Sequence, residues 1–145
     1  MVVASVVVTD ESVVVLSPDA LRRHLIERSR WIMWWPGSDA VLVRDDDAGG
    51  LEWLLSGVLV GRSRVTVVQQ VTGTLVRYVL EADPVEPGSR TRPRHLPDSP
   101  HGERELRRIE QVHRMAWKRS VWSLVDHGDS SPTQAPTTTA SRRER

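Results

Sequence analysis

The sequence predicts one α+β domain in which an antiparallel β-sheet curls around a long C-terminal α-helix. Alternating apolar and polar segments fill the middle of the chain, and the short links between them favour antiparallel neighbours. One long amphipathic segment, residues 103–125, follows them. The 145 residues suffice for one domain with a core but not for two ordinary ones.

Residues 2–16 are rich in β-branched side chains, with a polar interruption at residues 9–12. We expect one irregular edge strand with a bulge. The segment lacks the positively charged start of a signal peptide, so a strand is the better interpretation. No apolar run approaches the roughly 20 residues of a membrane-spanning helix, so no integral membrane segment is predicted and the expected location is the cytoplasm.

Two short helices are predicted after this strand. Ser17 is a suitable N-cap, and Pro18 follows it at the first helical position. Ser29 is expected to cap a second helical turn. The Trp-Pro-Gly sequence at residues 35–37 ends that turn, because proline disfavours helix in the residue before it and glycine permits a turn.

Four strands are predicted next, over residues 40–44, 51–60, 62–71 and 74–82. Turns are expected at residues 45–50, at Gly61 and at Gly73. Leu54 and Val58 do not fit the alternation that the last three strands otherwise show. The residues predicted to face the interior are Trp53, Leu55, Gly57, Val65, Val67, Tyr78 and Leu80.

The last part of the chain divides into three segments. Residues 83–102 contain five prolines, which indicates either a lid-like arm or a mobile loop. Apolar residues then recur at helical spacing through Val125, and Gly128 lies just past the predicted helix end. Residues 128–145 have almost nothing to bury, so they are predicted to be a disordered tail that follows a folded domain of residues 1–127.

Composition excludes several classes of function. The 20 Lys+Arg and 19 Asp+Glu leave a net charge of +1, so nucleic acid is not an expected partner. Without cysteine, disulfides, thiolate zinc sites and a cysteine nucleophile are excluded. His95, Asp98 and His101 lie in a flexible segment that would not hold metal ligands in place. No metal and no cofactor are predicted.

His113 and Glu110 lie three residues apart on or beside the inward face of the last helix. Both could point into a cavity, where an imidazole and a carboxylate could pass a proton to a bound carbonyl compound. In the alternative interpretation, His113 bonds to backbone or water and Glu110 pairs with Arg114 at the surface.

Trp53, Tyr78 and Trp117 are expected to converge on the interior. Their rings could stack on an aromatic or isoprenoid ligand, or they could fill the core of a chain that has no phenylalanine. On the opposite helix face, Trp122 and Met115 lie among cationic residues. That face could touch an anionic membrane or a second copy, and a homodimer or a packing contact is the preferred interpretation. The residues predicted to bind a ligand are Trp53, Leu55, Val67, Tyr78, Leu80, His113 and Trp117.

Four stretches carry a family resemblance, namely Ser17-Pro18, Trp34-Trp35-Pro36-Gly37, residues 50–61 and Ala116-Trp117-Lys118-Arg119. With the order of elements over about residues 1–125, they resemble the helix-grip fold of the START-like (SRPBCC, pollen-allergen-like) superfamily. The closer likeness is to its bacterial polyketide cyclase/dehydrase and lipid-transport branch. The resemblance implies a cavity between sheet and last helix that holds a hydrophobic small molecule. It implies no reaction, because cyclases, hydrolases, carriers and receptors share the scaffold.

Three hypotheses of function follow. The first is a carrier or binding protein for a lipid-like or polyketide-like compound. The second is an enzyme of the cyclase/dehydrase type that uses His113, with Glu110 or Tyr78, for proton transfer. The third is an interaction protein that works through its outer helix face and its Pro-rich segment.

Overall fold

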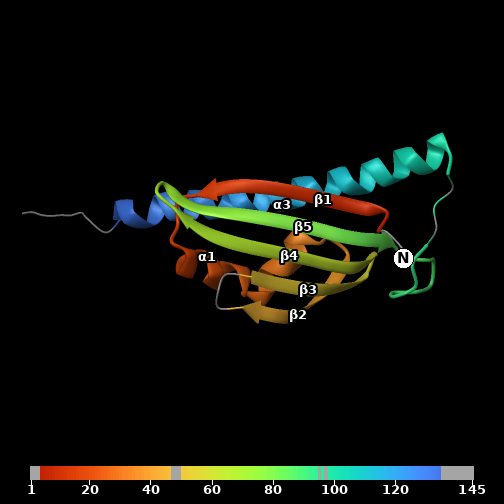
Figure 1. The fold of residues 1–145 in the computed structure, drawn as a ribbon, viewed down its shortest axis with the longest axis horizontal. Coiled ribbons are helices and arrows are strands. Elements are labelled where there is room, and N and C mark those ends of the chain that lie inside the picture. The colour runs from red at the N-terminus through yellow and green to blue at the C-terminus, as the bar shows by residue number, and fades with distance from the viewer. Residues whose placement is uncertain (1–3, 47–49, 95, 97, 135–145) are drawn as a thin grey trace, which may run out of the picture.

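The computed structural model describes residues 4–46, 50–94, 96 and 98–134. It shows a five-stranded antiparallel sheet with helices packed on one face (Figure 1). The strands lie in the order β1 (Val6–Val14), β5 (Gly73–Pro84), β4 (Leu59–Gln70), β3 (Gly50–Gly57) and β2 (Ser38–Asp46). The sheet is open, with β1 and β2 at its edges. The predicted α+β class and the edge position of the first strand are confirmed.

The ladder between β1 and β5 differs from the prediction. It runs without a register shift from Val6 opposite Ala82 to Val14 opposite Thr74, so the expected bulge is absent. The polar residues of β1 fit a regular strand because Asp10 and Ser12 point to the same face as Val6 and Val8. The irregularity lies instead at the other edge, where the register of β2 shifts between residues 42 and 44.

The turn between the second and third predicted strands lies earlier in the chain than the expected position at Gly61. The chain turns at Gly57 and Val58, whereas Gly61 lies inside β4. Glycine is needed at position 61 because a Cβ there would lie 2.3 Å from the carbonyl oxygen of Glu81 on the neighbouring strand. Leu54 and Val58 are 50% and 51% exposed, so they face outward and the alternation is intact.

Short helices α1 (Pro18–Leu25) and α2 (Trp31–Trp34) lie between β1 and β2, joined by the 3₁₀ turn η1 (Arg28–Arg30). Ser17 caps α1 as predicted, since its Oγ accepts a hydrogen bond from the Ala20 backbone N–H at 3.1 Å. Ser29 does not cap α2. It lies within η1, where its hydroxyl donates to Glu27 at 3.3 Å, because the turn already begins at Glu27.

The C-terminal helix α3 (Pro100–Gln134) is longer than predicted at both ends. Ser99 Oγ accepts a hydrogen bond from the Gly102 backbone N–H at 3.2 Å, and Pro100 takes the first helical position. At the other end Gly128 does not stop the helix, because a glycine costs an α-helix only about 1 kcal/mol. The first residues of the predicted tail are therefore helical through Gln134, and residues 135–145 lie outside the described residues.

Residues 85–94, here called the Pro-rich arm, form a hairpin at one end of the sheet. Val85 forms a β-bridge with Pro93, and the Glu86 backbone N–H donates to the Arg92 carbonyl at 2.9 Å. A further bond of 2.8 Å, from the Gly57 N–H to the Arg90 carbonyl, ties the arm to the end of β3. Figure 1 shows the N-terminal part of α3 standing away from the sheet at this same end.

Within the part of the chain that the structure describes, no helix is both long and apolar enough to cross a membrane.

Candidate functional site

The aromatic residues predicted to converge do meet beneath the sheet. Trp53 of β3, Tyr78 of β5 and Trp117 of α3 are each at most 1% exposed. The rings of Tyr78 and Trp117 stack at a centroid distance of 4.2 Å. Leu55 and Leu80 are buried in the same cluster, and Val67 packs against it while partly exposed. These side chains line the space that the sheet and α3 enclose.

Three further tryptophans, which the sequence reasoning did not place in this cluster, fill that space. Trp31, Trp34 and Trp35 come from the α2 segment, and their ring centroids lie 5.2–5.9 Å from that of Trp53. Trp34 also meets Trp117 edge to face at 5.6 Å. A usable signal was present, because a chain with six tryptophans and no phenylalanine must build its core from tryptophan. We call the rings of the five buried tryptophans and Tyr78 the aromatic core. The five are Trp31, Trp34, Trp35, Trp53 and Trp117.

Polar groups inside the aromatic core are mostly paired. The indole N–H of Trp35 donates to the Tyr78 hydroxyl at 3.1 Å, and that of Trp31 donates to the Leu25 carbonyl at 2.9 Å. Burial raises the pKa of Tyr78 well above its usual 10.0, so the phenol stays neutral. The indole N–H of Trp53 has no partner among the described residues. The arrangement is that of a packed core in which the Tyr78 phenol is neutral at pH 7 and two of the indole N–H groups are bonded within the protein.

Asp10 joins β1 to α3 and was missed at the sequence level. Its carboxylate lies 2.7 Å from the Lys118 ammonium and accepts hydrogen bonds from the Trp117 indole at 3.1 Å and the Ser12 hydroxyl at 3.0 Å. Its side chain is only 10% exposed. The signal was its position in β1, where an alternating pattern points residue 10 inward. The cluster anchors the C-terminal half of α3 to the edge strand.

His113 and Glu110 do not bond to each other in the described part of the chain. Glu110 Oε2 accepts a hydrogen bond from the Val7 backbone N–H at 3.3 Å, so it supports β1. His113 Nδ1 lies 2.9 Å from the Ile109 carbonyl oxygen. An oxygen acceptor requires a proton on Nδ1, which leaves the lone pair of the neutral ring on Nε2.

The Nε2 atom of His113 is buried and has no hydrogen-bond partner among the residues that the structure describes. The residue as a whole is 3% exposed. Burial lowers the pKa of this imidazole below its ordinary 6.5, although the bond to Ile109 acts in the opposite direction. His113 is therefore neutral at pH 7 and carries a buried acceptor that lacks a donor.

His113 forms part of the wall of a pocket of about 420 Å³, which we call the arm pocket. It lies between the Pro-rich arm, the adjoining end of the sheet and the N-terminal half of α3. Half of the other fourteen lining residues have apolar side chains, namely Pro36, Val58, Pro84, Val85, Pro87, Ile109 and Val112. Of the residues predicted to bind a ligand, His113 is the one that this pocket includes.

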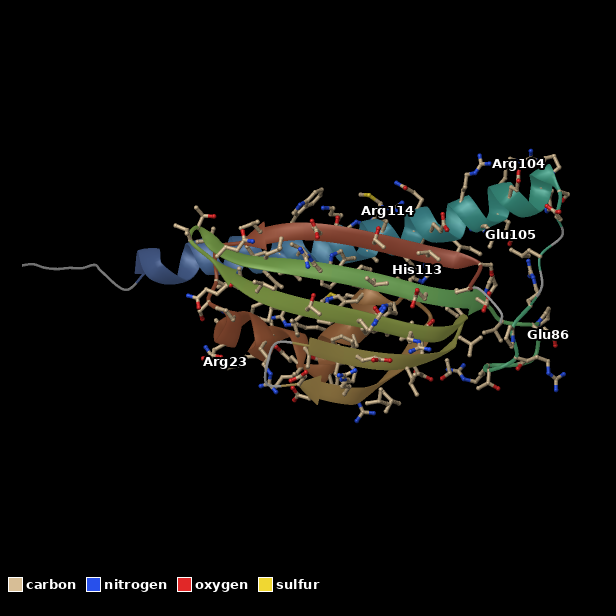
Figure 2. The ribbon with its side chains drawn as sticks, in the orientation of Figure 1. Arg23, Glu86, Arg104, Glu105, His113 and Arg114 are labelled. Atoms are coloured by element: carbon tan, nitrogen blue, oxygen red, sulfur yellow. The ribbon has the colours of Figure 1, made fainter. Side chains whose placement is uncertain are left out.

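Charged side chains also line the arm pocket. Glu105 Oε2 lies 3.5 Å from a guanidinium nitrogen of Arg94, in the arm, and 3.5 Å from one of Arg108, in α3. It therefore bridges two arginines. Figure 2 shows Glu105 on the N-terminal half of α3, Glu86 on the arm and His113 further along the helix. The pocket thus combines apolar and charged lining residues with a histidine whose buried Nε2 has no partner among the described residues, a mixture that suits an amphipathic small molecule.

No family model matches this chain, and no curated protein matches it in sequence. Solved structures do resemble it. A Cytophaga hutchinsonii protein determined in solution, structural-genomics target ChR145, has a TM-score of 0.55 and 6% identity, covering 92% of this chain and 99% of that one. The crystal structure of protein MLL2253 from Mesorhizobium loti gives 0.52 and 16%, covering 83% and 97%. At these identities the similarity is one of fold, and the sheet with its long C-terminal helix is compatible with a helix-grip arrangement.

Proposed function

We propose that this protein binds a hydrophobic small molecule of lipid-like or polyketide-like character in the arm pocket, as a carrier or binding protein. The observation that carries the proposal is that the wall of this partly apolar pocket includes His113, whose buried Nε2 has no hydrogen-bond partner among the described residues. An unpaired buried acceptor costs about 1–3 kcal/mol, which a ligand hydroxyl could recover by donating to it. The START-like resemblance of the sequence agrees with this class of ligand.

The size and walls of the arm pocket support the same proposal. Ligand pockets usually measure roughly 300–1,000 Å³, and the arm pocket measures about 420 Å³. The aromatic core, by contrast, is occupied by its own rings. The ligand is therefore expected to lie at the arm end of the molecule, with its apolar body against Val58, Ile109 and Val112.

Native mass spectrometry of freshly purified protein, with an organic extract of the same sample, tests whether a ligand is carried. A copurified apolar compound carrying a hydroxyl group is the expected result. A native mass equal to that of the bare chain, together with no binding of the apolar probe anilinonaphthalene sulfonate, would overturn the proposal.

Two substitutions locate the binding site. Val112→Trp should fill the arm pocket and abolish probe and ligand binding with little loss of stability, because Val112 is 46% exposed. Val41→Trp makes the same change at a valine of β2 that is 60% exposed, and it should leave binding unchanged. Equal binding by both variants would place the ligand elsewhere.

His113 Nε2 also supports a second candidate function, proton transfer in a cyclase/dehydrase-type reaction. A neutral imidazole with a free lone pair can act as a base at pH 7. On this hypothesis His113→Gln abolishes turnover of a poly-β-keto thioester but leaves its binding nearly intact. Loss of binding alone favours the carrier, and unchanged turnover excludes the enzymatic role of His113.

A further inference from the structure

One face formed by α2 and α3 exposes apolar side chains. Trp122 of α3 is 56% exposed, whereas the other five tryptophans are at most 9% exposed. On α2, Ile32 is 67% and Met33 51% exposed. Large apolar side chains gathered in this way mark interaction surfaces more often than isolated ones do.

Met33 of α2 and Trp122 of α3 both adjoin Arg119. A pocket of about 260 Å³ between the two helices is lined by Arg30 and Met33 from the α2 segment and by Ala116, Arg119, Ser120 and Ser123 from α3. Met33 and Arg119 therefore face the same hollow. Trp122 follows Arg119 by three residues, so the two side chains are neighbours on the helix surface. We call Ile32, Met33, Arg119 and Trp122 the α2–α3 face.

Among the side chains that the structure describes, cations outnumber anions on η1, α2 and the adjoining part of α3. Arg119 and Arg28 have no ion pair among the described residues, and Arg30 pairs with Glu27 at 2.9 Å. The nearby Lys118 is held by Asp10. Three arginines thus stand against one glutamate, beside exposed tryptophan, methionine and isoleucine side chains.

We propose that the α2–α3 face docks on an anionic phospholipid surface. Indole rings favour the boundary between headgroups and acyl chains, and arginine forks pair with lipid phosphates. A twofold contact with a second copy would instead gather the arginines of both copies at one interface. Nucleic acid would leave Ile32 and Met33 without a role. This proposal does not depend on the arm pocket, which lies along the other half of α3.

Trp122 provides a direct readout, because the other indoles are buried. We expect the protein to cosediment with vesicles of equal parts phosphatidylglycerol and phosphatidylcholine but not with phosphatidylcholine alone. Salt should weaken the binding. Trp122 emission should shift to the blue and be quenched by brominated acyl chains. Absence of binding to the anionic vesicles would overturn the proposal.

Matched variants test the residues involved. Arg119→Glu should weaken vesicle binding by at least about fivefold, the effect of one cation near an anionic surface. Arg44→Glu makes the same charge change at an exposed position of β2 and should not affect binding. Trp122→Ser should remove the spectral shift. Vesicle binding that survives Trp122→Ser and Arg119→Glu unchanged, or a dimer in sedimentation velocity that Trp122→Ser abolishes, would refute the assignment.

Discussion

The two halves of α3 belong to the same helix but are packed in different ways. From His113 to Leu124 the inward residues are buried against β1, α2 and the aromatic core. From Pro100 to Val112 only Gly102 is buried, while Leu106 and Ile109 are partly covered. The first half faces the Pro-rich arm across the arm pocket and meets β1 through Glu110.

This difference indicates where the proposed ligand would bind. Tryptophans from the α2 segment reach the second half of α3 and fill the space under the sheet. That part of the interior is therefore close-packed and leaves little room for a ligand. These tryptophans do not reach the first half of α3, where the smaller side chains of proline and valine leave a pocket. Stability is expected to reside in the core half and ligand exchange in the arm half.

The largest predicted effect is in the core half. Trp117→Ala should lower the free energy of unfolding by about 3–5 kcal/mol, because the ring is fully packed and stacks on Tyr78. Chemical denaturation measures the change. Trp122→Ala is the control and should cost no more than about 0.5 kcal/mol, as expected of an exposed side chain. Similar costs for the two variants would contradict the contrast between packed and open faces.

A smaller effect is predicted for the anchor between α3 and β1. Asp10→Asn should cost about 2 kcal/mol, because it leaves Lys118 without its anion in a partly buried site. Glu11→Gln offers a control, since its ion pair with Arg77 is more than half exposed on both sides and should contribute less than about 1 kcal/mol. If thermal unfolding shows equal losses for both, the Asp10 cluster is not an anchor.

The smallest predicted effect is the contribution of His113 to the pH dependence of the free energy of unfolding. Burial lowers its pKa below 6.5, so the unfolded chain takes up the proton first as pH falls. Stability should therefore be lost below about pH 6.5 by at most about 1.4 kcal/mol per pH unit, with no such loss above it. His113→Phe should remove this part of the acid sensitivity. Identical stability profiles for the two proteins would show that His113 is not buried in neutral form.

The contrast between α3 halves also shows how far the sequence could predict the site. The helical period placed His113 and Trp117 on the inward face, and both are buried there. It could not assign hydrogen-bond partners. Glu110 meets the backbone of Val7 because β1 lies along α3, a contact between residues about a hundred positions apart. The partners of Asp10 depend on the same long-range packing.

The sequence by itself determined the α+β class, the antiparallel strands, their inward and outward faces and the long last helix. These depend on local propensities and on the periods of two and 3.6 residues, which can be read from neighbouring positions. Only the tertiary structure decided that α2 fills the space beneath the sheet, that the Pro-rich arm forms a hairpin and that the pocket lies beside it. These features depend on side-chain volumes meeting across distant segments, which periodicity does not encode.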